Sequence, residues 1–211
     1  MTSLSSGRPV RMADCRGLWR RTLLIDTDGR RDTTADVRWL QGITAFVDLR
    51  RPAPGSPSLH DGFAGWLHQH DDVFEWSRFT GVQPAGEHPD AGRMCWEGDV
   101  LVETGVHADY VEHWVLEPAP GPCWGLSLAG SGGGQGLLVR VGGHFGWATD
   151  TVDGVEISLG RVSGAGWEIT DSCHPARHGV ELRPRLRASA LTVGHSGEAW
   201  TVTNSEGEVK V

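Results

Sequence analysis

The 211-residue chain is poor in several residue types, and each shortage excludes a class of chemistry. Its only lysine is Lys210, next to the C-terminus, which excludes a Schiff base on a buried lysine. The net charge is -8 without a basic cluster, which argues against a nucleic-acid partner. Neither a membrane-spanning apolar run nor a signal-peptide core is found. We therefore expect a cytoplasmic protein with no membrane partner.

Motifs for metals, cofactors and covalent catalysis are also lacking. The four cysteines, Cys15, Cys95, Cys123 and Cys173, form no C-x-x-C pair. No serine lies in a G-x-S-x-G context, and the glycine-rich run 131–136 lacks the lysine and helix of a phosphate loop. The sequence therefore predicts no cofactor and no nucleophile elbow.

Two histidines leave a metal site open as an alternative. His68 and His70 would share one face of a strand, with Asp71 directly after them. A metal needs three such groups to converge, and spacing alone does not show that. We favour solvated histidines on an edge strand and predict no metal.

Glycine and tryptophan are abundant, at 30 and 10 residues, and short apolar runs are separated by turn residues. Runs with a period of two recur every ~8 to 12 residues, and no helix of four turns is convincing, so we predict an all-β sandwich or barrel. Residues 1–14 are predicted to be a disordered tail and 15–211 a single β-barrel domain. After 117–122 the pattern starts again, so halves of about 15–116 and 117–211 are predicted, with a true duplication left open.

The stretch 98–114 contains the most informative strand faces. It reads as two strands around Gly105, and Glu103 lies on the first. On the second, Tyr110, Glu112 and Trp114 share a face because side chains alternate along a strand. Such a face either looks into a partly polar cavity or lies on a solvated exterior.

Other strands repeat this mixture of aromatic and charged side chains. Asp48 and Arg50 share a face with Phe46, and Trp76 shares one with Arg78. The run TADVRWLQ, which contains Trp39 and Gln41, is read as a further strand.

Six short motifs between residues 46 and 114 resemble a known family. They are FVDLR (46–50), GFAGW (62–66), EWSR (75–78), DAGRM (90–94), LVETG (101–105) and DYVEHW (109–114). In order and spacing they are similar to runs of the fungal HRI family, the yeast casein-kinase-I-interacting proteins. DAGRM departs from the family pattern because it lacks the acidic second position. The resemblance implies an antiparallel, calycin-like (lipocalin-type) β-barrel and carries no defined activity.

On such a barrel the mixed faces form a candidate site. The candidate acid–base groups are Glu112, Tyr110, Glu103 and Asp48, and the candidate substrate-binding groups are Arg50, Arg78, Trp39, Gln41, Trp76 and Trp114. Glu112 is the first choice for proton transfer, with Tyr110 as a proton donor or orienter and Arg50 or Arg78 as the anchor for an anionic group. The alternatives are a structural ion-pair network and a solvated outer face.

Two functions from different classes follow. The first is a cofactor-independent enzyme that isomerises, hydrates, eliminates from or cyclises a small, partly apolar molecule. The second is a non-catalytic carrier of lipocalin type, and a protein-interaction module is a further alternative. A small-molecule ligand is expected in the first two, and the oligomeric state is left open, with a homodimer as one option.

Overall fold

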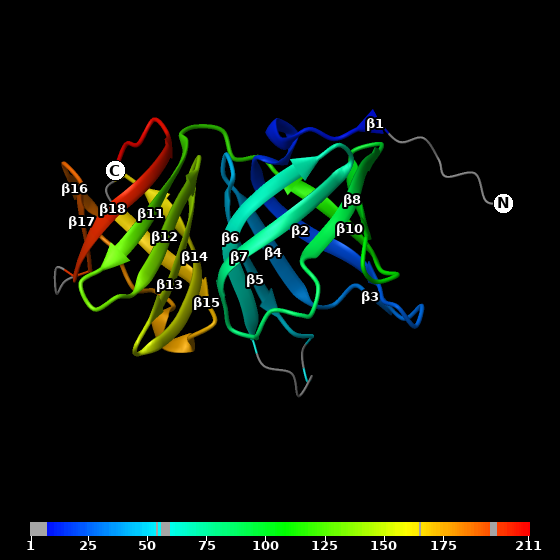
Figure 1. The fold of residues 1–211 in the computed structure, drawn as a ribbon, viewed down its shortest axis with the longest axis horizontal. Coiled ribbons are helices and arrows are strands. Elements are labelled where there is room, and N and C mark those ends of the chain that lie inside the picture. Colours follow the sequence, from blue (N-terminus) through cyan, green and yellow to red (C-terminus); the bar gives the residue numbers. More distant parts are fainter. Residues whose placement is uncertain (1–7, 54, 56–59, 165, 195–197) are drawn as a thin grey trace.

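The computed structural model describes residues 8–53, 55, 60–164, 166–194 and 198–211. Strands account for 64% of it and helix for 4%, so the predicted all-β, calycin-like class is confirmed. Two curved sheets lie side by side, with β1 at the edge of the first and the C-terminus beside the second (Figure 1). None of the helices among these residues has the length and apolarity needed to span a membrane.

The first sheet closes into an antiparallel barrel. Eight strands pair in the order β2, β4, β5, β6, β7, β8, β9, β10 and back to β2, while β1 and β3 extend its edges. The strands are β1 Arg8–Pro9, β2 Gly17–Ile25, β3 Arg31–Asp32, β4 Asp36–Gln41, β5 Ala45–Arg51, β6 Asp61–His70, β7 Val73–Gly81, β8 Asp90–Glu97, β9 Val100–Gly105 and β10 Val111–Glu117.

The second sheet is open and curves as a half-barrel. Its eight strands follow the order β15, β14, β13, β12, β11, β18, β17, β16. They are β11 Cys123–Gly130, β12 Gln135–Val141, β13 His144–Thr151, β14 Gly154–Ser163, β15 Gly166–Ser172, β16 Arg185–Arg187, β17 Ala190–Val193 and β18 Glu198–Gly207, with short 3-10 turns η1 Met12–Cys15 and η2 Pro175–Arg177.

This arrangement differs from the single barrel that the sequence analysis expected. The two halves do divide between Glu117 and Cys123, yet each half forms its own sheet. Period-two patterning fixes which face of a strand is apolar, but it does not say which strands pair. A chain of short strands therefore predicts the class and leaves the number of sheets undetermined.

Strands β4 to β6 are buried on both faces because the second sheet packs on the outside of the barrel. On β5, Phe46 points into the barrel core, while Val47 and Leu49 join the apolar layer between the sheets. Val139 and Ile157 of the second sheet belong to the same layer. The predicted alternation along residues 46–50 is therefore correct, and its second face meets another sheet.

One carboxylate ties the two sheets together. Glu206, on β18, accepts backbone N–H bonds from Ile43 (3.1 Å), Thr44 (2.9 Å) and Ala45 (2.9 Å) in the β4–β5 turn. It also accepts the Thr44 hydroxyl at 2.6 Å. The carboxylate of Glu206 therefore accepts hydrogen bonds from backbone N–H groups in a turn, where the strand ladder does not supply acceptors.

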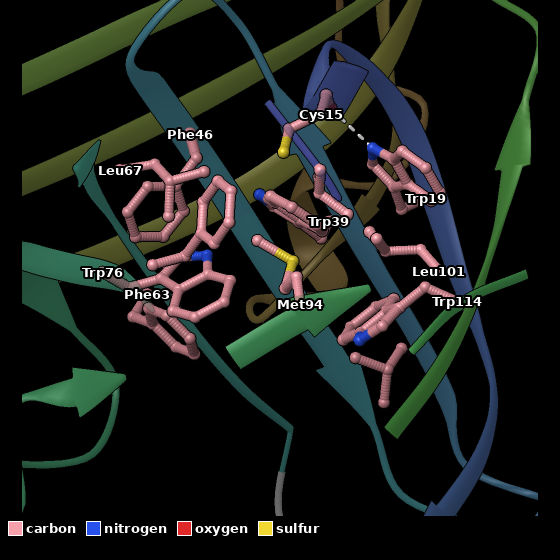
Figure 2. Close-up of a cluster of buried hydrophobic side chains, with 13 residues drawn as sticks. Cys15, Trp19, Trp39, Phe46, Phe63, Leu67, Trp76, Met94, Leu101 and Trp114 are labelled. Atoms are coloured by element: carbon pink, nitrogen blue, oxygen red, sulfur yellow. Dashed lines mark hydrogen bonds between the residues drawn. The ribbon is translucent and has the colours of Figure 1, made fainter. Parts of the chain in front are cut away.

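Apolar side chains fill the barrel, with Trp39 between the walls (Figure 2). Cys15 and Phe63 lie at opposite ends of this cluster (Figure 2). Trp39 packs edge-on against Trp76 at 5.7 Å and Trp114 at 5.8 Å between ring centroids, a favoured aromatic geometry.

The N-terminal segment is more ordered than the sequence predicted. Of the expected tail 1–14, residues 1–7 lie outside the described residues, but Arg8–Pro9 pair with β8 as strand β1. Val10 is buried in the barrel core, and its carbonyl accepts the Gln69 amide at 3.0 Å. A single apolar residue among polar neighbours gave too weak a periodic signal to predict this.

Candidate functional site

A cavity of about 260 Å³ opens inside the closed barrel, beside the tryptophan cluster. Such a volume is near the lower end for small-molecule sites. Its walls come from β2 and β4 to β10 and combine aromatic rings with charged groups; the lining residues are Arg21, Leu24, Asp26, Trp39, Asp48, Arg50, Phe63, Trp76, Arg78, Asp90, Glu103, Tyr110, Glu112 and Trp114.

Nine of the ten predicted site residues line this cavity: Glu112, Tyr110, Glu103, Asp48, Arg50, Arg78, Trp39, Trp76 and Trp114. Gln41 is the exception. It is fully buried beneath the cavity, where its oxygen accepts the Trp39 indole N–H at 2.9 Å and its amide donates to the Thr44 carbonyl at 3.0 Å. Gln41 therefore orients Trp39 and does not face the cavity.

Two β-bulges shape the cavity wall. The pairing of β10 with β2 skips Thr22, so Arg21 and Leu24 both face the cavity. The pairing of β6 with β7 skips Phe79, directly after the inward-facing Arg78. Each bulge directly follows an arginine and reverses which side chains of its strand point inward beyond that residue. Bulges are known to redirect side chains at functional sites in this way.

Glu103 lies at the centre of a hydrogen-bonded group. The Tyr110 hydroxyl donates to its Oε1 at 2.8 Å, and the Trp114 indole N–H donates to its Oε2 at 3.3 Å. Gly92 and Gly105 make room for this group. A Cβ on Gly92 would stand 2.5 Å from Cγ of Glu103, and one on Gly105 would stand 2.4 Å from the Tyr110 ring.

The surroundings of Glu103 favour its protonated form. Burial, followed by the negative charges of Glu112 and Asp90, raises the pKa of the Glu103 carboxyl well above its ordinary value. The hydrogen bond from Tyr110 and the charge of Arg50 oppose this without reversing it. Burial and the nearby Glu103 also raise the pKa of Tyr110, so its hydroxyl keeps its proton.

Glu112 has the opposite environment, although it is directly across from Glu103 in the β9–β10 ladder. It pairs with Arg21 at 2.5 Å, and both side chains are more than nine-tenths buried. Two glutamates on adjacent strands thus have different partners: Glu112 has a cation, and Glu103 has the neutral donors of Tyr110 and Trp114.

The remaining arginines are also occupied by carboxylates. Arg50 bonds Asp48 at 2.7 Å, and Arg78 bonds Asp90 at 2.7 Å. Burial still raises the pKa of Asp48 despite the charge of Arg50. Both guanidiniums also lie against the Phe63 ring, at 4.9 Å and 3.5 Å from its centroid. The sequence analysis suggested that one of these arginines anchors an anionic group. Both are already paired with carboxylates, so neither is free for that role.

Sequence reasoning missed five lining residues: Arg21, Leu24, Asp26, Phe63 and Asp90. Alternation from the core residue Trp19 points to Arg21, and alternation back from Met94 points to Asp90. Nothing in the sequence announces the bulge at Thr22, which is what turns Leu24 and Asp26 inward.

The alternative metal site has no geometric support. His68 and His70 are exposed, as predicted, but β6 pairs with both β5 and β7 and is not the edge strand that the sequence analysis expected. Across the described parts of the chain, no three histidine, cysteine, aspartate or glutamate side chains lie close enough together to hold a metal ion.

A larger cavity, of about 570 Å³, lies on the second sheet between Trp147, Glu156, Arg177 and Glu181. Its Glu156 is bonded by Arg177 at 2.8 Å and by the Ser158 hydroxyl at 2.8 Å. Among the residues that the structure describes, fully buried carboxylates occur in the barrel and not in this sheet. The barrel cavity is therefore the better candidate for chemistry.

Comparisons with known proteins bear on the fold. Searches against protein-family models and curated proteins find no match. Among solved structures, the chain is similar to YLR301w of Saccharomyces cerevisiae, a protein described as uncharacterized. The TM-score is 0.65 at 13% identity, and the match covers 90% of this chain and 98% of the yeast chain. At this identity the likeness shows a shared two-sheet fold and carries no function.

Proposed function

We propose that the barrel cavity is the site of a cofactor-independent acid–base reaction on a small molecule. Glu103 is the protonated acid, and Glu112, paired with Arg21, is the base or the charge that stabilises the reacting group. The observation that carries the proposal is this pair of facing glutamates in opposite environments, since such pairs supply both an acid and a base near neutral pH.

The proposal moves the proton donor from Glu112 to Glu103. Glu112 is bound tightly to Arg21, so a proton placed on it would break a buried ion pair. Glu103 can release a proton without that loss, and the hydroxyl of Tyr110 then stabilises the carboxylate that forms. Isomerisation, hydration, elimination and cyclisation all need a donor of this kind.

Replacing each glutamate by glutamine removes its exchangeable carboxyl proton and tests the proposal. Wild type, Glu103→Gln and Glu112→Gln are incubated with a metabolite extract, and mass spectrometry follows which compounds disappear. We expect turnover to fall ~100-fold or more in both variants, because glutamine keeps the shape and loses proton exchange. Glu97→Gln, an exposed change on β8, is the matched control and should keep full activity. Equal turnover in all four proteins would overturn the acid–base roles.

A carrier function is the second candidate, and the three arginine–carboxylate pairs favour it. Arg21, Arg50 and Arg78 each hold a carboxylate, which gives the cavity a rigid polar wall suited to recognition. A carrier would bind a compound from the same extract unchanged. Wild type would then form no product, and the affinity of the protein for the bound compound would change in Glu103→Gln.

Kinship with the fungal HRI family is likewise proposed, on the six motifs between residues 46 and 114. Those motifs contribute ten of the cavity-lining residues: Asp48, Arg50, Phe63, Trp76, Arg78, Asp90, Glu103, Tyr110, Glu112 and Trp114. If the kinship holds, fungal members should carry a similar cavity, and a member with apolar residues at the matching glutamates would contradict it.

A further inference from the structure

The charges that line the barrel cavity do not balance. Three arginines face five carboxyl groups, an excess of two acids. Each arginine pairs with one carboxylate of the cavity, and Arg21 also lies 3.8 Å from Asp32 outside the lining, which leaves Glu103 and Asp26. Asp26 belongs to a turn and accepts the Thr27 N–H at 2.7 Å. Within the described residues, Glu103 is the one fully buried carboxyl of the cavity without an arginine in ion-pair distance.

The aromatic walls of the cavity already hold positive charge. The guanidinium of Arg78 lies 3.5 Å from the Phe63 centroid, and that of Arg50 lies 4.9 Å from it. The electron-rich faces of aromatic rings attract cations, most strongly where water is excluded. Trp39, Trp76 and Trp114 supply further indole surface at the same cavity, so its walls suit an organic cation as well as an apolar group.

We propose that the cavity takes its ligand as a small organic ammonium ion, whose positive charge lies beside Glu103 and against the indoles. The inference rests on the proposed function and concerns the same cavity: the ammonium complex, with Glu103 ionised, has the charges that follow proton transfer from Glu103 to a substrate. When the ammonium enters, the proton on Glu103 leaves to solvent and the carboxylate pairs with the incoming charge. An ammonium ion also resembles a substrate that becomes cationic when Glu103 protonates it, so binding and catalysis would use the same charge.

The other groups that face Glu103 are consistent with this exchange. Glu112 and Asp90 add negative charge that favours a cation, whereas Arg50 is already matched to Asp48. The Tyr110 hydroxyl can donate to Glu103 in both protonation states. An anionic ligand would meet these carboxylates without a free arginine, and a neutral ligand would leave the proton on Glu103.

Three probes of nearly equal shape test the proposal: 2-phenylethylammonium, 2-phenylethanol and phenylacetate. Calorimetry at pH 7 in two buffers of different ionisation enthalpy measures both affinity and proton release. We expect the ammonium to bind at least about tenfold more tightly than the alcohol, with close to one proton released. Phenylacetate should bind most weakly.

Variants decide whether Glu103 carries the effect. In Glu103→Gln we expect the proton release to vanish and the preference for the ammonium to fall about tenfold, while Glu97→Gln, the exposed control, behaves as wild type. Equal binding of alcohol and ammonium, or binding of neither, would overturn the ammonium inference. Neither result touches the acid–base proposal, since that is decided by turnover of extract compounds. If wild type binds the ammonium but turns over no compound of the extract, only the acid–base proposal is overturned.

Discussion

The closed barrel and the open second sheet are both rich in tryptophan, yet they use their interiors differently. Six of the ten tryptophans lie before residue 117 and four after it. The barrel also buries the carboxyls of Asp48, Glu103 and Glu112, whereas the buried polar side chains described in the second sheet are Thr149, Ser158 and Ser172. Buried charge is costly, and the second sheet shows that the fold does not require it. The buried charges of the barrel are therefore a local feature and not a requirement of the fold, and the proposed ligand site accounts for them.

The connection between the two regions gives the largest expected effect. Glu206→Ala removes the carboxylate that accepts from Ile43, Thr44 and Ala45, and it leaves amide donors without partners beside the packed interface. We expect unfolding free energy to fall by about 3 to 5 kcal/mol in urea titrations. Separate unfolding transitions for the barrel and the second sheet in this variant would show that Glu206 couples their unfolding.

Glu208→Ala is the matched control, since it lies two residues along and pairs only with the exposed Lys210. It should change stability by less than about 0.5 kcal/mol. If Glu206→Ala were equally mild, the two sheets would be held by apolar packing alone.

Breaking one internal ion pair comes next. Arg50→Ala leaves the buried Asp48 without its cation, so we expect a loss of about 2 to 4 kcal/mol. Adding Asp48→Asn to this variant should recover part of the loss, because an uncharged amide is less costly to bury. Arg93→Ala, which breaks an exposed pair with Asp72, should cost much less, because solvent screens that pair. Equal losses for the two arginines would remove the distinction between interior and surface charge.

Most of the candidate site could be predicted because alternation along a strand is a local property. Asp48 with Arg50, Trp76 with Arg78, and Glu112 with Trp114 keep their predicted common faces. Gln41 also alternates with Trp39, but it lies next to Gly42 at the β4–β5 turn, below the cavity. Position along the barrel axis depends on strand register, which short motifs do not contain.

The different partners of the two glutamates and the number of sheets could not be predicted for a related reason. The contrast between Glu103 and Glu112 depends on Arg21, which is 91 residues away from Glu112 in the chain. Likewise, the second apolar face of β5 is explained by a sheet formed from the other half of the chain. The Arg21–Glu112 pair and the packing of the second sheet on β5 both join residues that are far apart in the sequence. The period-two pattern describes single strands and contains no such information.

The pH dependence of stability sharpens the contrast in buried charge. Because the pKa of Glu103 is raised above its ordinary value of 4.5, the folded protein binds more protons than the unfolded chain above that pH. Stability is therefore lost as pH rises from about 4.5 through the raised value, by up to ~1.4 kcal/mol per pH unit. Glu103→Gln should lack this contribution.

The measurement is the difference between the wild-type and Glu103→Gln stability curves from pH 4 to 9. Taking the difference cancels groups common to both proteins, including Asp48, whose pKa is also raised, and His144, whose pKa is lowered by burial. Parallel curves would mean that Glu103 ionises normally and would contradict its role as the protonated acid.

The smallest expected effect compares one tryptophan from each region. Trp114 and Trp200 are about equally buried, at 2% and 3% exposure, so replacement by phenylalanine should remove similar packing. The Trp114 indole N–H donates to Glu103, whereas the Trp200 indole N–H is buried without a partner in the described structure. Trp114→Phe should therefore cost about 1 kcal/mol more than Trp200→Phe in chemical denaturation. Only Trp114→Phe should also move the pH at which Glu103 titrates, because it removes a donor to that carboxyl. If both variants lost the same unfolding free energy and Glu103 titrated at the same pH, the hydrogen bond from Trp114 to Glu103 would contribute nothing, and both tryptophans would act only through apolar packing.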